Sequence, residues 1–548
     1  MNYKIDIKLI FALTGGILFN YLFWEEELAL NLIIYSVFIL IVFHFSNNLL
    51  LTKKLILIAG AHLLAGILLL INHSIVNILS WYISLFVLLG YLHHTQLRSI
   101  FTLLTAAFLQ FILAPVNLVK KTTEIEIGAL SLKPLLKLVK YLIIPSFILF
   151  LFSIIYSIAN PVFASYIGSF FENFSLFINS IFTFFFKDIR IERILFLVLG
   201  ILFSTGIFIT CKHELEKIES GFHDHLLRVR RDKKHYSIWR ELSTLFSGNL
   251  TNKKMALKTE NTIAVISFLG LNILLLLLNS IDFSTLWMGN LGSLNFSQAL
   301  HGSTNALIVS IVMAMIVILY FFNGNLNFYS KNKMIRLLAY GWIIQNVFLI
   351  LSVLLRDYHY IAMHGLTHKR IGVLVFSLLC AVGLLTVYLK VAKKKSFFYL
   401  FKTNGAIWYL LLILSGAINW DAFIVDYNID KKNSATLDVN YLMSLSDKTL
   451  PQLIENKELL RKHLSPNYST NPYVDEYTNV KSLDTSTTKK SIVDSVELKK
   501  QIKQRLEQTF EQNLANRVQN FNKNFKNTSW LSWNYRDWQT NHYLNDRK

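Results

Sequence analysis

The sequence has few charged residues, few prolines and few cysteines for its 548 residues. Charged side chains make up 16% of the chain, below the roughly 25% of ordinary soluble domains, whereas hydrophobic residues make up 53%. The 7 prolines and 22 glycines are too few for long disordered linkers. Cys211 and Cys380 both lie in apolar runs, which excludes a disulfide framework or a thiolate metal site and predicts two packing residues.

Sequence motifs for catalysis are also missing. The chain has no phosphate-binding loop, no glycine-rich dinucleotide fingerprint and no nucleophile elbow, so we expect no catalytic residue and no cofactor. No acidic residue lies clearly in the middle of an apolar run, where a proton-coupled pump would need one. The polar side chains that do lie in such runs are His44, His62, Gln110, Asn272, Gln345 and Asn346. We interpret Gln345 and Asn346 as bonding across to a neighbouring helix.

Apolar runs close to the length of a membrane-spanning helix are abundant. A span needs about 20 mostly apolar residues, because lipid offers no hydrogen-bond partner to the backbone. Twelve runs meet or approach that length: Leu9–Phe23, Leu28–Phe45, Leu55–Ile71, Ile75–Tyr91, Ile100–Pro115, Tyr141–Ile158, Ile191–Cys211, Thr262–Leu278, Ser303–Phe322, Leu337–Leu355, Ile371–Val391 and Phe398–Ile418. The sequence predicts an all-α fold: a polytopic transmembrane helix bundle of about 11–12 spans with a small helical extramembrane C-terminal domain. The first run is predicted to be a retained helix, since no small-residue cleavage site follows it.

The basic residues between the runs predict their orientation, because cytoplasmic loops carry an excess of Lys and Arg. The very basic connection from Lys212 to Lys258 is expected in the cytoplasm, which also puts residues 116–140 there and the C-terminal tail outside. Lys4 and Lys8 place the N-terminus in the cytoplasm too. Both the N-terminus and residues 116–140 can be cytoplasmic only if one of the five runs between them does not span the membrane. We expect that run to be Ile100–Pro115, which is short and polar-interrupted, and predict it to be re-entrant or interfacial. Twelve spans with the N-terminus outside is the alternative.

The chain therefore divides into six predicted segments. These are N-terminal transmembrane helices at 1–115, a basic cytoplasmic loop at 116–140, two transmembrane helices flanking an outer amphipathic segment at 141–211, a second basic loop at 212–261, five transmembrane helices at 262–418 and an extracytoplasmic helical tail at 419–548. In the tail, a long helix is signalled by Ser491 three residues before Asp494. Its apolar residues are Ile502, Leu506, Phe510, Leu514, Val518, Phe521 and Phe525. That face needs a partner on the tail's other helices, on the outer loops or on another copy.

A histidine-rich stretch, RDYHYIAMHGLTHKR from Arg356 to Arg370, connects two apolar runs. His364 and His368 could hold a transition metal at helical spacing, but only His359 and Asp357 are near enough to complete a zinc site. We therefore favour a polar outer turn and predict no metal.

In this interpretation, Gly365 permits an unusual backbone angle, Thr367 caps the next helix and Arg370 reaches lipid headgroups. A second histidine group, at His213, His223, His225 and His235, lacks metalloprotease spacing and is predicted to be solvated loop.

Six short motifs occur once each along the chain, in a recognisable order. They are FNYLFWEEELALN after the first run, ANPVF at 159–163, YIAMHGLTHKR at 360–370, NWDAFIVDYNI at 419–429, LDVNYLMSLSDKTLPQL at 437–453 and WLSWNYRD at 530–537. Together they resemble a large bacterial family of uncharacterised multi-pass membrane proteins, known as a domain of unknown function. The resemblance implies no catalytic residue, but it marks an outer turn of unknown role formed by Arg356, Tyr360, Gly365, Leu366, Thr367 and Arg370.

The most consistent hypothesis is a non-enzymatic multi-pass protein of the bacterial cytoplasmic (inner) membrane, whose tail serves sensing, assembly or envelope interaction. One alternative is a transporter or lipid-handling protein with a cavity near Gln110 and Pro145. Another is an outer-face transferase that uses Asp357 or His359. Expected partners are membrane lipids, with a further copy or an envelope protein bound through the tail. Nucleic acid is not expected, because the net charge of +20 collects in loops that would face an anionic leaflet.

Overall fold

The computed structural model describes residues 6–47, 52–123, 145, 148–185, 190–210, 214–227, 256–288, 296–322, 325–430, 437–464 and 490–546. In these residues the regular structure is helical, apart from one isolated bridge between His225 and Lys395. Eight described helices are long and apolar enough to cross a membrane, and four shorter apolar helices accompany them. All twelve coincide with the predicted apolar runs, which confirms the all-α, multi-pass class. Cys211, His213, His235, most of the two basic loops and residues 465–489 of the tail lie outside the described residues.

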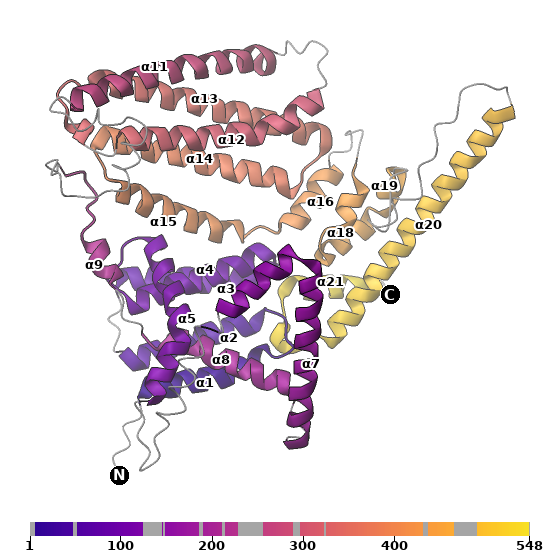
Figure 1. Ribbon diagram of the computed structural model, residues 1–548. Helices are drawn as coiled ribbons and strands as arrows, with labels where there is room; N and C mark the ends of the chain where they lie inside the picture. The colour runs from indigo at the N-terminus through magenta and orange to yellow at the C-terminus, as the bar shows by residue number, and fades with distance from the viewer. Residues whose placement is uncertain are drawn as a thin grey trace. The chain divides into compact units, whose positions relative to one another are not determined.

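The chain forms two compact units (Figure 1). Unit 1 comprises Met1–Ser220 and Thr528–Tyr535, and unit 2 comprises Gly221–Asn527 and Arg536–Lys548. The described helices of unit 1 are α1 (Ile7–Phe23), α2 (Leu30–Asn47), α3 (Lys53–Asn72), α4 (Ile75–His93), α5 (Ile100–Thr123), Ile148–Ala159, α7 (Pro161–Phe185), α8 (Ile191–Phe208), α9 (Leu215–Ser220) and η5 (Trp530–Ser532). The side chains of Asp6, Thr52 and Ser74 accept backbone N–H groups and so cap α1, α3 and α4.

Helices α1 and α8 approach each other closely because glycines line their contact. A Cβ at Gly16 would lie 2.7 Å from the Cα of Ile201, and a Cβ at Gly200 would lie 2.8 Å from the Phe19 ring. Small residues allow this approach between apolar helices that have no hydrophobic driving force for association in lipid.

His62 is buried between α2, α3 and α4, where both of its ring nitrogens have partners. Nδ1 lies 2.8 Å from Ser84 Oγ and Nε2 lies 3.0 Å from Ser36 Oγ, which also accepts the Trp81 indole N–H. The two hydroxyls also donate to backbone carbonyls of their own helices, Ser84 to Trp81 and Ser36 to Leu32. The network therefore joins three helices of the bundle, a structural role for this histidine.

The start of α1 and the ends of α4 and α8 lie together at one end of unit 1, since Thr210 accepts from Lys8 Nζ and lies 2.9 Å from His93 Nδ1. Helix α5 contacts this end of the unit with its first turn and again with its last turn. At the start of α5, Glu219 of α9 accepts the backbone N–H groups of residues 98 and 99 and the Thr102 hydroxyl. At its finish, Lys121 forms an ion pair of 2.9 Å with the Asp6 carboxylate.

Figure 1 shows α5 running across the direction of α1 and α4. Its 24 residues span about 36 Å. Pro115, expected to end this helix, lies inside it, because neighbouring helices in a bundle compensate for one missing backbone bond. Length and composition alone would allow Ile100–Thr122 to span a membrane.

Helix α7 occupies the predicted amphipathic segment. Its start is fixed by the Asn160 side chain, which accepts from the N–H groups of Val162 and Phe163 at 2.9 and 3.2 Å, with Pro161 as the first helical residue. The helix itself is thus confirmed, and its location at the outer membrane surface stays a prediction.

Unit 2 holds the remaining helices. They are α11 (Ala256–Asp282), the π-helix η2 (Phe283–Trp287), α12 (Phe296–Phe321), η3 (Asn325–Phe328), α13 (Lys333–His364), α14 (His368–Lys393), α15 (Phe397–Ser415), α16 (Trp420–Asp430), α17 (Val439–Met443), η4 (Asp447–Thr449), α18 (Leu450–Glu455), α19 (Lys457–Lys462), α20 (Lys490–Asn527) and α21, which begins at Tyr535 and ends at Asp546.

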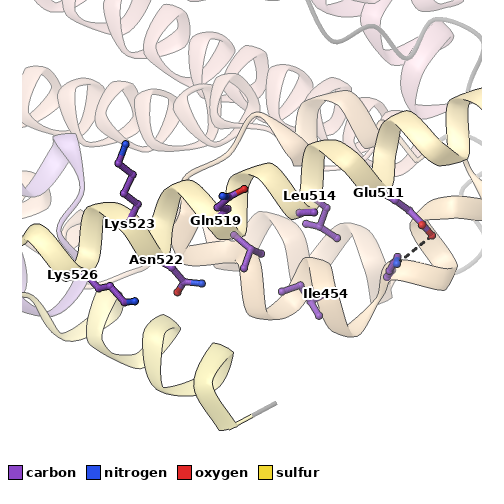
Figure 2. A pocket seen from close by; sticks show the side chains of 10 residues that line it. Ile454, Glu511, Leu514, Gln519, Asn522, Lys523 and Lys526 are labelled. Carbon is purple, nitrogen blue, oxygen red and sulfur yellow. Dashed lines mark ion pairs between the residues drawn. The ribbon is translucent and has the colours of Figure 1, made fainter. Parts of the chain in front are cut away.

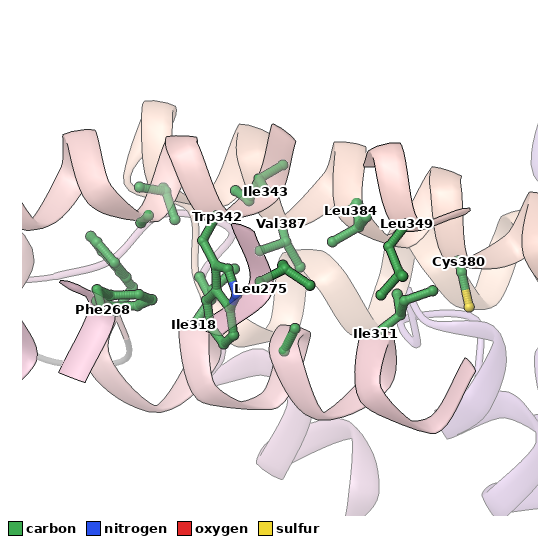
Figure 3. Packing of buried hydrophobic residues seen from close by; sticks show 14 of the residues in the cluster. Phe268, Leu275, Ile311, Ile318, Trp342, Ile343, Leu349, Cys380, Leu384 and Val387 are labelled. Atoms are coloured by element: carbon green, nitrogen blue, oxygen red, sulfur yellow. The ribbon is translucent and has the colours of Figure 1, made fainter. Parts of the chain in front are cut away.

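Helices α11 to α14 share one hydrophobic core (Figure 3). Cys380 is buried in it, which confirms its predicted packing role. Gln345 Nε2 donates to Asn272 Oδ1 of α11 at 3.1 Å, as expected for an amide that links two helices. Asn346 donates instead to the Trp342 carbonyl of its own helix, so the prediction is right for Gln345 and wrong for Asn346.

The segment at 221–227 lies beside the connection between α14 and α15. Its backbone bonds join Leu226 to Lys394 and Asp224 to Ser396, each at 3.0 Å, and the Asp224 carboxylate lies 2.5 Å from Lys402 Nζ. The beginning of the basic loop that follows α8 is therefore on the same side of the bundle as the end of α14.

Candidate functional site

The predicted outer turn is smaller than its sequence suggested. Helix α13 continues nine residues past the apolar run, to His364, and α14 begins at His368, so only residues 365–367 connect them. Arg356 and Tyr360 therefore belong to a helix end rather than to a turn. Polar residues extend the helix here because they face protein partners instead of lipid.

Gly365 ends α13 with φ of +79°, the left-handed region that favours glycine, as predicted. A Cβ at this position would also lie 2.5 Å from Asn428 Oδ1. Glycine is thus required twice, by the backbone angle and by the approach of α16.

Asn428 of α16 pairs with the backbone of Leu366 through both atoms of its amide. Asn428 Oδ1 accepts from Leu366 N at 2.6 Å, and Asn428 Nδ2 donates to Leu366 O at 2.9 Å. Both residues are buried, so these two bonds satisfy backbone groups that water does not reach. This pair joins the connection to the C-terminal helices.

Arg370 binds the end of α13. Its guanidinium lies 4.4 Å from the centre of the Tyr360 ring, and Nη1 donates to the carbonyls of His364 and Gly365. The last carbonyls of a helix lack backbone partners and attract a cation. They therefore bind the Arg370 side chain, which we expected to reach lipid headgroups instead. Within the predicted landmark, Arg370 and Tyr360 thus form one stacked pair.

Thr367 holds the N-cap position of α14, but its side chain makes no capping hydrogen bond. The N–H of His368 donates instead to the Tyr441 hydroxyl at 2.9 Å. His368 Nε2 lies 2.7 Å from Asp421 Oδ1, whereas His364 stacks on Tyr360. The histidines therefore have separate partners, and no group of three metal-binding side chains occurs among the residues that the structure describes.

An ion pair that sequence reasoning missed joins α11 to α13. The carboxylate of Asp282 pairs with the Arg356 guanidinium, with side-chain exposures of 3% and 12%. Asp282 lies four residues past the apolar run Thr262–Leu278 and directly precedes a π-helical turn, Phe283–Trp287, a type of turn that often occurs at functional sites. The sequence signal was Asp282 itself, an acidic residue near the end of an apolar run. Its partner, Arg356, lies 74 positions away in the sequence.

The C-terminal helices pack on this connection through a second hydrophobic core. It combines Ile361 of α13 and Ile371 of α14 with residues of α16 to α21, including Phe510, Leu514 and Phe521 of α20. The apolar face predicted for the long helix packs in this core from Leu506 to Phe525, whereas Ile502 at its start is exposed. The Arg517 guanidinium adds bonds to the Asp447 carboxylate and to the carbonyls of Met443 and Leu445.

Two of the six sequence motifs meet in unit 1. Ser532 of the WLSWNYRD motif and the preceding Ser529 both donate to the Glu26 carboxylate in the acidic connection between α1 and α2. The Ser532 hydroxyl also accepts from Glu27 N at 2.8 Å. These bonds join residues about 500 positions apart, which no local pattern could predict.

The bundle of apolar helices and the helical cover on one of its connections define a multi-pass α-helical membrane protein. Residues 32–456 match the family described as a domain of unknown function, DUF4153, and the chain belongs to that family. No curated protein and no solved structure matches the chain. The matched residues include Gly365, Asn428 and Tyr441, whereas α20 and α21 lie beyond them.

Proposed function

We propose that the chain is a non-enzymatic protein of the bacterial cytoplasmic membrane, with eleven crossings and its C-terminal helices outside, where they interact with envelope components. The observation that carries this proposal is the pairing of Asn428 with Leu366 inside a shared core. The family landmark serves to anchor a helical domain, and an anchored domain suits assembly or sensing.

The contacts of α5 support eleven crossings. Among the twelve apolar helices of the described residues, α5 is the one that we assign to a membrane surface, because its two ends contact Glu219 and Asp6 at one end of unit 1. Its basic last turn, Lys120 and Lys121, then faces the cytoplasm together with the loop that follows.

The contacts of the tail support the same count. Asn428 bonds to the α13–α14 connection, and Ser532 bonds to the α1–α2 connection. No apolar run of spanning length follows Trp420, so both connections share the side of the tail. An even number of crossings must then separate them, although nine apolar helices lie between them. In the topology we propose, one of the nine therefore does not cross, and the contacts of α5 favour that helix.

A comparison of two kinds of variant in a deletion strain tests the role. Stopping the chain after residue 489 removes α20, η5 and α21 and should reproduce the envelope sensitivity of the deletion strain, measured as survival in detergent and after osmotic shock. The combination Asp357→Asn with His359→Gln removes the candidate acid and base and should survive like the wild type. The reverse result would favour an outer-face enzyme and overturn the proposal.

A transport function is the second candidate, favoured by the buried pair of Asp282 and Arg356. Ionisable groups inside a helix bundle are costly and often mark a pathway. Asp282→Asn keeps the shape and removes the charge, so solute-dependent transport in proteoliposomes that vanishes in this variant would support the second candidate over the first.

A further inference from the structure

An open groove runs between α20 and the short helices α18 and α19 of unit 2 (Figure 2). It encloses about 730 Å³. Its floor is apolar, and Figure 2 shows Ile454 of α18 and Leu514 of α20 on facing sides. Ala515 and Val518 continue this floor along α20.

The charges around the groove are unequal along its length. Lys457 lies at one end, where its amine forms an ion pair of 3.2 Å with the Glu511 carboxylate. Lys523 and Lys526 lie toward the other end of the lining and are exposed, and neither forms an ion pair with any residue that the structure describes. One end of the groove is therefore neutralised, and the other carries uncompensated positive charge.

A polar acceptor lies beside these lysines. Asn522 Oδ1 is buried and has no hydrogen-bond donor among the described residues. A buried acceptor without a donor is costly, so a ligand that brings a hydroxyl group to this point would gain a hydrogen bond.

We propose that the groove binds one anionic phospholipid, with an acyl chain on the apolar floor and the phosphate at Lys523 and Lys526. An acidic peptide would pair with the two lysines but leave the apolar floor exposed to water, whereas an anionic amphiphile would cover the floor and also pair with the lysines. This inference rests on the proposed function in taking the C-terminal helices to lie beside the membrane. It does not depend on which side they occupy.

The test uses the full-length purified protein and phosphatidylglycerol with a photoreactive acyl chain. Crosslinks are counted in peptides of α18 and α20, which separates the groove from lipid around the bundle. We expect crosslinking with phosphatidylglycerol and about tenfold less with phosphatidylcholine of the same chains. Equal crosslinking by the two lipids would overturn the proposal.

Matched variants locate the charge. Lys523→Glu with Lys526→Glu should reduce crosslinking about tenfold, because two attractive charges become repulsive. Lys503→Glu with Arg505→Glu reverses two exposed charges of the same helix away from the groove and should leave it unchanged. Similar losses in both pairs would mean non-specific attraction, which contradicts a site.

A third variant tests the floor. Ala515 is exposed and lines the groove, so Ala515→Leu fills it without altering the buried core, and helical circular dichroism should stay at the wild-type level. We expect crosslinking to be lost. Retained crosslinking, or full competition by soluble glycerol phosphate, would show that the lysines bind phosphate without a lipid chain and would overturn the proposal. Either failure leaves the eleven-crossing topology standing, since labelling experiments test that separately.

Discussion

Asn428 is the residue on which the coupling between the α13–α14 connection and the C-terminal helices most depends. Asn428→Ala removes both bonds to Leu366 and leaves a buried N–H and a buried carbonyl without partners. We expect the free energy of unfolding to fall by about 2–4 kcal/mol, because each orphaned group costs about 1–3 kcal/mol. Thermal unfolding of the full chain in detergent measures this. Asn545→Ala on exposed α21 is the control, and equal effects of both changes would refute the coupling.

His94 should make stability depend on pH. Burial lowers the pKa of His94 below its ordinary value of 6.5, although the Glu216 carboxylate at 3.5 Å opposes this. The unfolded chain then binds the proton first, so stability falls as the pH drops through about 6.5. His94→Gln should flatten the change in melting temperature between about pH 8 and pH 5, whereas exposed His223→Gln should not. A melting temperature that rises on acidification would contradict the assignment.

Single residues were predictable from sequence where local geometry decides them. Gly365 needs a positive φ at a helix end, and Cys380 sits in an apolar run, so both were predicted correctly. Arg370 and Thr367 were not, because their roles depend on distant groups: the Tyr360 ring and the Tyr441 hydroxyl. Sequence spacing carries no signal for such partners.

At the scale of elements, the α1–α8 contact should be the most sensitive to added volume. Gly16→Ala would bring a Cβ within 2.7 Å of the Ile201 backbone, which cannot rotate away. We expect a loss of about 1–3 kcal/mol from overpacking. At Gly60 of α3 a Cβ would meet nothing within 4 Å, so Gly60→Ala should be neutral or slightly stabilising. The two melting temperatures, compared in one detergent, check this, and equal values would contradict the close contact.

Helices were predictable because apolar runs and caps are local signals, whereas their ends and directions were not. Helix α13 extends past Leu355 because Arg356 and the residues after it find partners on other helices. Helix α5 has the composition of a span, yet Glu219 and Asp6 hold its ends at one end of unit 1. The basic loops required one run that does not cross, and shortness and polar residues selected Ile100–Pro115; its failure to cross stays a prediction.

For the whole molecule, the topology that we propose has the helical domain on the side opposite the basic loops. The α5 helix is the element on which the crossing count depends. If it crossed, the chain would cross twelve times rather than eleven.

Cysteine labelling in intact cells tests this count most directly. In a chain with Cys211→Ser and Cys380→Ser, single cysteines are introduced as Gln96→Cys before α5, Lys120→Cys in its last turn and Asn545→Cys in α21. We expect a membrane-impermeant maleimide to label the Asn545→Cys chain in intact cells and the other two chains only after permeabilisation. Opposite accessibility at positions 96 and 120 would mean that α5 crosses the membrane and would contradict the eleven-crossing topology.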